Sequence, residues 1–133
     1  MVLLGLMACT MAGPGETRTY TWDAKDYSFS NPETIQGGLV TIKVKNTGKE
    51  PHHLQLVRVN DPSQMNTVME GLKKEDLSVL RFASMPGGVG ALNPGLEGEI
   101  AANLQEGQYI LACFIPSPDG KPHIEKGMIS RSG

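Results

Sequence analysis

Apolar and polar residues alternate along several short stretches of the chain, a period of two that is typical of β-strands with one buried face. The clearest stretch is Leu39–Lys45, in which Val40, Ile42 and Val44 share one face and polar residues share the other. This stretch predicts a half-buried strand, and we expect it to pair antiparallel with its neighbours.

Four other segments alternate or are rich in β-branched and aromatic residues, which favour strands. They are residues 17–22, 27–30, 52–59 and 109–114, with a weaker candidate at 99–103. Turn-forming residues separate them, as at Asn31-Pro32 and Gly37-Gly38. The pattern predicts an all-β fold.

Residues 60–95 interrupt this pattern. After Asp61-Pro62-Ser63, apolar residues recur at helical spacing and predict a short helix, which Gly71 weakens. These apolar residues are Met65, Val68, Met69 and Leu72. Leu77 and Leu80 predict a further helical turn with a shared face, whereas residues 85–98 are rich in glycine and proline and are predicted to form a loop. We therefore expect a β-sandwich with a helical insertion around residues 61–81.

The composition fits one globular domain and narrows its partners. The chain has 133 residues and an apolar fraction of 39%, enough for one modest core. A net charge of −2 gives no basic surface for nucleic acid, so we expect no nucleic-acid partner. We expect the domain to occupy residues 17–133 and to be a monomer.

The first 16 residues differ in character from the rest. A short apolar run passes abruptly into small and polar residues, which resembles the end of a secretory segment. Leu6-Met7-Ala8-Cys9 resembles the cleavage box of bacterial lipoproteins, in which the cysteine carries lipid. We expect residues 1–16 to be an export or lipoprotein-type segment or a disordered tail, and the protein to be periplasmic or extracellular, with membrane attachment if Cys9 is lipidated.

The segment CFIPSPDGKPHIEKGM, residues 113–128, brings three soft side chains together. Alternation along the preceding strand places Cys113 on the same face as Tyr109 and Leu111. A proline-rich loop then presents His123, and Met128 follows Gly127. Far away in the sequence, His52 and His53 begin another predicted strand, where they must face opposite sides.

A thiolate, two imidazoles and a weak axial thioether form the ligand set that suits copper in an electron-transfer site. Zinc could use the same cysteine and histidines but would gain little from Met128. Two other interpretations of Cys113 stay open, a disulfide with Cys9 and a thiol nucleophile paired with histidine. Each histidine could also be merely structural.

Three runs of sequence resemble the cupredoxins, the plastocyanin and azurin group of blue copper proteins. They are FSNPETIQGG at 29–38, VKNTGKEPH at 44–52 and GQYILAC at 107–113. The resemblance implies a Greek-key β-sandwich with one type 1 copper ion near one end. Carried over by position, the family's ligands become His52, Cys113, His123 and Met128, with the Pro-His match favouring His52 over His53.

The resemblance implies a copper protein that is not an enzyme. It would carry single electrons, or hold copper for delivery, with a redox or copper-delivery protein as partner. Nine residues separate Cys113 from His123, a longer loop than is usual in that family, and this length leaves open whether His123 is held further out. The alternative function is a metal-free β-sandwich that serves as a structural or interaction module through residues 60–95.

Overall fold

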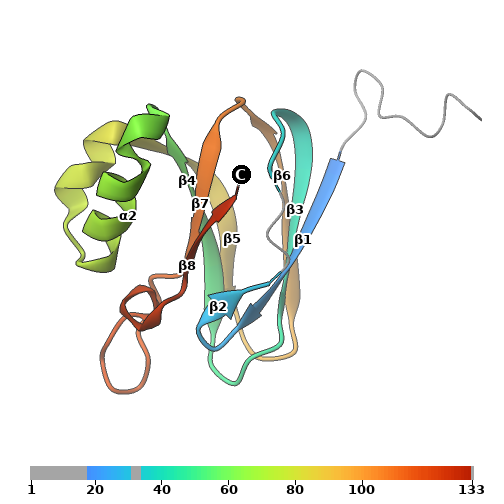
Figure 1. Ribbon diagram of the computed structural model, residues 1–133. Helices are drawn as coiled ribbons and strands as arrows, with labels where there is room; N and C mark the ends of the chain where they lie inside the picture. Colours follow the sequence, from blue (N-terminus) through green and yellow to red (C-terminus); the bar gives the residue numbers. More distant parts are fainter. Residues whose placement is uncertain (1–17, 31–33, 133) are drawn as a thin grey trace, which may run out of the picture.

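The computed structural model describes residues 18–30 and 34–132, which form two four-stranded β-sheets packed face to face (Figure 1). The first sheet has the order β2-β1-β3-β6 and consists of Ser28–Phe29, Arg18–Lys25, Gly38–Asn46 and Glu97–Leu104. The second sheet has the order β5-β4-β7-β8 and consists of Ala83–Leu92, His52–Val59, Gln108–Ala112 and Ile129–Ser132. Strand β7 lies beside β4 although β5 and β6 separate them in the chain. The predicted Greek-key sandwich is confirmed, while the predicted segment 1–16, with Cys9, lies outside the described residues.

Strand β3 confirms the predicted faces but corrects the predicted pairing. Val40, Ile42 and Val44 are fully buried, as the alternation requires. The strand runs antiparallel to β6 but parallel to β1, so the expectation of antiparallel pairing was wrong on one side. The alternation within a strand reports which face is buried and carries no information on the direction of the neighbours.

Two hydrophobic cores lie on the two faces of the second sheet. The core between the sheets includes Tyr109, Leu111 and Cys113, which confirms that these three residues share a face. The core on the outer face includes Ile110 and Ala112 of the same strand. Because β7 is buried on both faces from Tyr109 to Ala112, these four residues form an unbroken apolar run.

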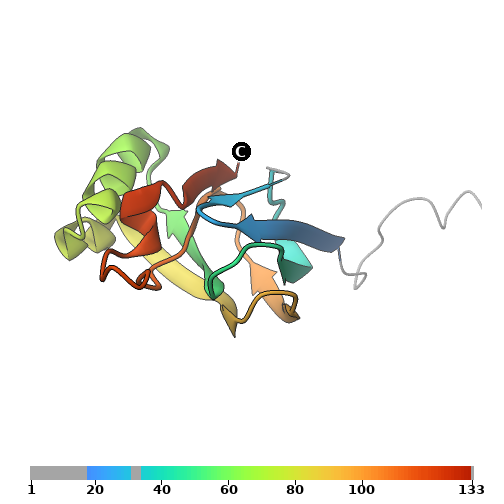
Figure 2. The same cartoon turned by 90° about the horizontal axis from the view of Figure 1, so that it is seen from below.

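A helical insertion covers the outer face of the second sheet, as predicted (Figures 1 and 2). It consists of the 3₁₀ helix η1 at Pro62–Gln64, the helix α2 at Met65–Lys73 and the 3₁₀ helix η2 at Leu77–Phe82. The apolar stripe of α2 packs on β4 and β7 through Met65, Val68 and Leu72. The predicted role of Leu77 was wrong, because it is 61% exposed and Val79 is buried in its place. Among the residues that the structure describes, no helix is both long and apolar enough to cross a membrane.

The glycine- and proline-rich stretch predicted to be a loop, residues 85–98, is mostly strand. Strand β5 runs from Ala83 to Leu92 and pairs antiparallel with β4, and β6 begins at Glu97. A Cβ atom at Gly88 would overlap the carbonyl oxygen of Leu54, so only glycine allows this approach of β5 to β4. The glycines that predicted a loop are here part of an edge strand.

Candidate metal centre

The candidate ligands meet at one end of the sandwich. The turn between β1 and β2, the loop between β3 and β4 and the segment 113–128 all lie at the lower end in Figure 1. His52 opens β4 and Cys113 directly follows β7. His123 opens a short 3₁₀ helix, η3, which spans His123–Lys126. Adjacent strands and one short helix thus bring His52 together with Cys113 and His123, which are 61 and 71 positions further along the chain.

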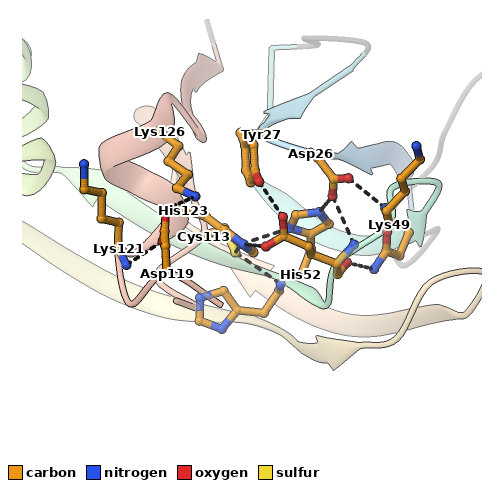
Figure 3. A network of polar contacts seen from close by, with 12 residues as sticks. Asp26, Tyr27, Lys49, His52, Cys113, Asp119, Lys121, His123 and Lys126 are labelled. Carbon is orange, nitrogen blue, oxygen red and sulfur yellow. Dashed lines mark hydrogen bonds and ion pairs between the residues drawn. The ribbon is translucent and has the colours of Figure 1, made fainter. Parts of the chain in front are cut away.

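Three of the four predicted ligands form a tight buried cluster. One ligand atom each from His52, Cys113 and His123 lies within 4.8 Å of the other two, and all three residues are fully buried. Nδ1 of His123 is 3.1 Å from Nδ1 of His52 and 3.4 Å from Sγ of Cys113. Figure 3 shows the rings and the sulfur turned toward one another.

The sequence left open whether the long loop between Cys113 and His123 holds the histidine further out, and the structure shows that it does not. Its residues fold back on themselves, with a bridge between Pro116 and Pro122 and a bond from the Ser117 N–H to the Lys121 carbonyl. The His123 N–H donates to the carbonyl of Ile115 at 2.8 Å and closes the base of this hairpin. The additional residues therefore project outward, and His123 lies beside Cys113.

Met128 is tied to the same group through its backbone. Its N–H donates to the His123 carbonyl at 3.1 Å, and its carbonyl accepts from the Cys113 N–H at 3.2 Å. Gly127 precedes it with φ of 107°, a left-handed conformation that favours glycine. The Met128 side chain is fully buried in the same core cluster as Cys113. These bonds and this burial place Met128 next to Cys113 and His123 in the core.

The two adjacent histidines have different environments. His53 points to the other face of β4, where its Nε2 accepts from the Phe114 N–H at 2.9 Å. Its backbone N–H donates to Sγ of Cys113 at 3.5 Å. The choice of His52 over His53 for the cluster agrees with this geometry.

Each clustered histidine is also held by a carboxylate on its far side, which the sequence had not indicated. Nε2 of His52 is 2.6 Å from Oδ1 of Asp26, and Nε2 of His123 is 2.9 Å from Oε1 of Glu50. Asp26 lies in the β1–β2 turn and Glu50 in the β3–β4 loop. An acidic residue in a turn is common, so no pattern in the sequence marks these two.

The ionisation of both carboxylates is supported by donors around them. Burial opposes the charge of Asp26, but the Lys49 N–H, the His52 ring and the Glu50 N–H outweigh it, so the pKa of Asp26 is lowered. The Tyr27 hydroxyl and the His123 ring lower the pKa of Glu50 to about 2. Carboxylates in this state only accept hydrogen bonds, so each Nε2 carries the proton.

This proton assignment leaves the inner nitrogens without hydrogens. A ring that carries one proton, at Nε2, keeps a lone pair at Nδ1, and the Nδ1 atoms of the two histidines lie 3.1 Å apart. Burial lowers the pKa of His52, which disfavours a second proton on that ring. Two converging lone pairs and a nearby sulfur in a buried pocket form a site that favours a cation.

The thiol is better suited to binding a metal than to attacking a substrate. Cys113 is fully buried, and burial raises the pKa of its thiol. A nucleophilic cysteine requires access and a lowered pKa, so the geometry does not favour the thiol–imidazole pair considered from the sequence. Cys113 is a free cysteine in the structure.

Comparisons with solved structures identify proteins of the same fold. Auracyanin A, a "blue" copper protein from Chloroflexus aurantiacus, superposes with a TM-score of 0.53 at 18% identity, over 76% of this chain and 89% of its own. The dithionite-reduced auracyanin of Roseiflexus castenholzii gives 0.57 at 18% identity, over 85% and 93%. Auracyanin B gives 0.57 at 17% identity, over 91% and 89%. Comparison of the sequence with protein-family models and with curated proteins finds no match. The predicted cupredoxin-like fold is thereby confirmed.

Proposed function

We propose that this protein binds one copper ion of type 1 through His52, Cys113, His123 and Met128, and uses it to carry single electrons. The observation that supports this most directly is the convergence of three soft or intermediate ligand atoms within 4.8 Å in a fully buried pocket. The same fold occurs in auracyanin A, which is a "blue" copper protein.

The donor set favours copper over other metals. Two imidazole nitrogens and one thiolate, with a weak thioether, suit copper. Among the divalent first-row transition metals, copper also has the highest affinity for nitrogen and sulfur ligands. A hard cation such as magnesium would require oxygen ligands, and the carboxylates nearby are engaged with the outer ring nitrogens. Bound copper supplies a one-electron couple between its divalent and monovalent states.

The protein's own residues hold the pocket in one shape. The hairpin base at Ile115 and His123, together with the bonds of Met128, fastens the ligand loop to β7. The His53 N–H donates to the cysteine sulfur and lowers its charge density. The burial of both rings excludes water. A rigid, dry pocket requires little rearrangement when one electron is added or removed, and we therefore propose electron transfer rather than turnover of a substrate.

The decisive test is the visible spectrum of the purified protein after addition of copper. We expect a thiolate-to-copper absorption band that is absent from Cys113→Ala. Met128→Leu should retain copper and change its reduction potential, because the axial ligand tunes the potential. Met85→Leu is the matched control, since Met85 is 46% exposed and outside the cluster.

Two other results would change the proposal. Copper retained without the band, and with slow redox cycling, would indicate storage or delivery. A featureless spectrum with no copper after desalting would refute the metal site and leave the metal-free interaction module.

We further propose that the protein works at the cell envelope, periplasmic or extracellular, with a redox or copper-delivery protein as partner. The apolar and then small residues before Thr17 support export. Mass spectrometry of the mature N-terminus tests this: removal of the first eight residues with a lipid on Cys9 is the expected result for a lipoprotein.

A further inference from the structure

The carboxylates of Asp26 and Glu50 each contact the outer nitrogen of one clustered histidine. We propose that Asp26 and Glu50 are positioning residues, each of which fixes one ligand histidine in the Nε2-protonated form and makes the pocket favour divalent over monovalent copper. The preference for the divalent state rests on the proposed function, whereas the fixed rings are a property of the metal-free protein.

Asp26 is held from three directions. Its carboxylate accepts from the Lys49 N–H at 2.8 Å and from the Glu50 N–H at 3.2 Å, besides its bond to the His52 ring at 2.6 Å. A Cβ atom at Gly48 would lie 2.5 Å from Oδ1 of Asp26 and 3.0 Å from Nε2 of His52. Glycine at this position therefore leaves the space in which the carboxylate meets the ring.

The Glu50 side chain is held in a second network, which is joined to the first by the bond from the Glu50 N–H to Asp26. Its Oε1 is 2.9 Å from Nε2 of His123, while the Tyr27 hydroxyl donates to its Oε2. The Tyr27 ring lies 5.2 Å from the His123 ring and 5.0 Å from Nζ of Lys126 (Figure 3). Lys126 in turn forms an ion pair with Asp119 at 2.8 Å, on the hairpin. This layer covers the His123 ring, which is fully buried.

The two networks have the same chemical effect on the inner side of each ring. An ionised carboxylate accepts a hydrogen bond from the Nε2–H group, so that Nδ1 keeps its lone pair and points to the cluster. The carboxylate also makes the imidazole a stronger electron donor. With the thiolate, three negative groups lie around one pocket, and they stabilise a cation of higher charge more than one of lower charge. The side chains of Asp26 and Glu50 are only about one-fifth exposed, which limits the screening of that effect by water.

The first experiment uses the metal-free protein. Nitrogen-15 NMR of the histidine rings should show both His52 and His123 protonated at Nε2 and not at Nδ1. Glu50→Gln should preserve this state for His123, because the amide oxygen still accepts from Nε2 and the amide nitrogen can donate to Tyr27. Glu50→Leu removes the acceptor and should release the ring into a mixture of both forms. Protonation of His123 at Nδ1 in the unaltered protein would overturn the assignment.

The second experiment measures copper in both oxidation states. Glu50→Gln keeps the hydrogen bonds and removes the charge, so we expect the affinity for divalent relative to monovalent copper to fall about tenfold. That change corresponds to a rise of about 59 mV in the reduction potential for one electron. Glu125→Gln is the matched control, since Glu125 is exposed on η3 two residues from His123 and makes the same change of charge.

The outcomes separate this inference from the proposed function. An equal response of the two glutamine variants would refute the role of Glu50 in setting the potential. Absence of copper binding by the unaltered protein would refute the proposed function, while the ring protonation would still decide whether the carboxylates position the histidines. Asp26→Asn tests the role proposed for Asp26. Its effects on the protonation of the His52 ring and on the relative affinity for divalent and monovalent copper are measured in the same two experiments.

Discussion

Gly48→Ala is expected to destabilise the protein although alanine is ordinarily well tolerated in place of glycine. Gly48 does not have a positive φ, so its backbone conformation is open to alanine. The cost is steric. The new Cβ would lie 2.5 Å from Oδ1 of Asp26, 2.9 Å from its backbone nitrogen and 3.0 Å from Nε2 of His52. The Asp26 nitrogen belongs to the turn between β1 and β2 and cannot rotate away as a side-chain atom can.

The magnitude follows from the hydrogen bonds that the displaced carboxylate makes. Three donors converge on Asp26, and hydrogen bonds to charged groups contribute about 1.5–3 kcal/mol each. Partial exposure of the carboxylate reduces this range. Loss of one bond and lengthening of the others should lower the free energy of unfolding by about 2 kcal/mol.

The assay is denaturant unfolding of the metal-free protein, with Gly90→Ala as control. Gly90 is exposed on β5, and a Cβ atom there would meet nothing within 4 Å. We expect the control to change stability by less than about 0.5 kcal/mol. If both alanine variants unfold at the same denaturant concentration, the space at Gly48 is not what allows Asp26 to reach His52.

Two further substitutions test other parts of the structure. Gly71→Ala should destabilise the protein by about 1–2 kcal/mol despite the higher helix propensity of alanine, because the new Cβ in α2 would overlap Val79. In a Val79→Ala background the same change should cost less. Equal costs in the two backgrounds, measured by thermal unfolding, would contradict the steric cause. His53→Phe should cost about 1–3 kcal/mol because the Phe114 N–H loses its acceptor, whereas His53→Gln should retain more stability in the same measurement.

Local patterns predicted much of this fold because they report directly on burial. The alternation at Val40, Ile42 and Val44 identified a half-buried strand, and the 3.6-residue spacing from Met65 to Leu72 identified α2. Strand β5 was missed because an edge strand rich in glycine has little apolar alternation and is held by backbone hydrogen bonds to β4. The parallel partner of β3 was missed because the period of a strand is the same in either pairing direction.

The candidate ligands were predictable by residue type and order, since thiolate, imidazole and thioether are rare enough together to indicate copper. Their carboxylate partners were not. Asp26 is 26 positions from His52 and Glu50 is 73 positions from His123, in turns whose sequences would suit any surface.

The chain's chemistry is therefore determined by its sequence: one cysteine, histidine and methionine in a short segment, and a histidine at the start of a distant strand. Only the tertiary structure decided that a nine-residue hairpin folds outward rather than displacing His123, and which acidic side chains lie behind the rings. The physical reason is that the period of a strand or helix indicates which face a side chain occupies. The partners of that side chain depend instead on which loops meet at the end of the sandwich.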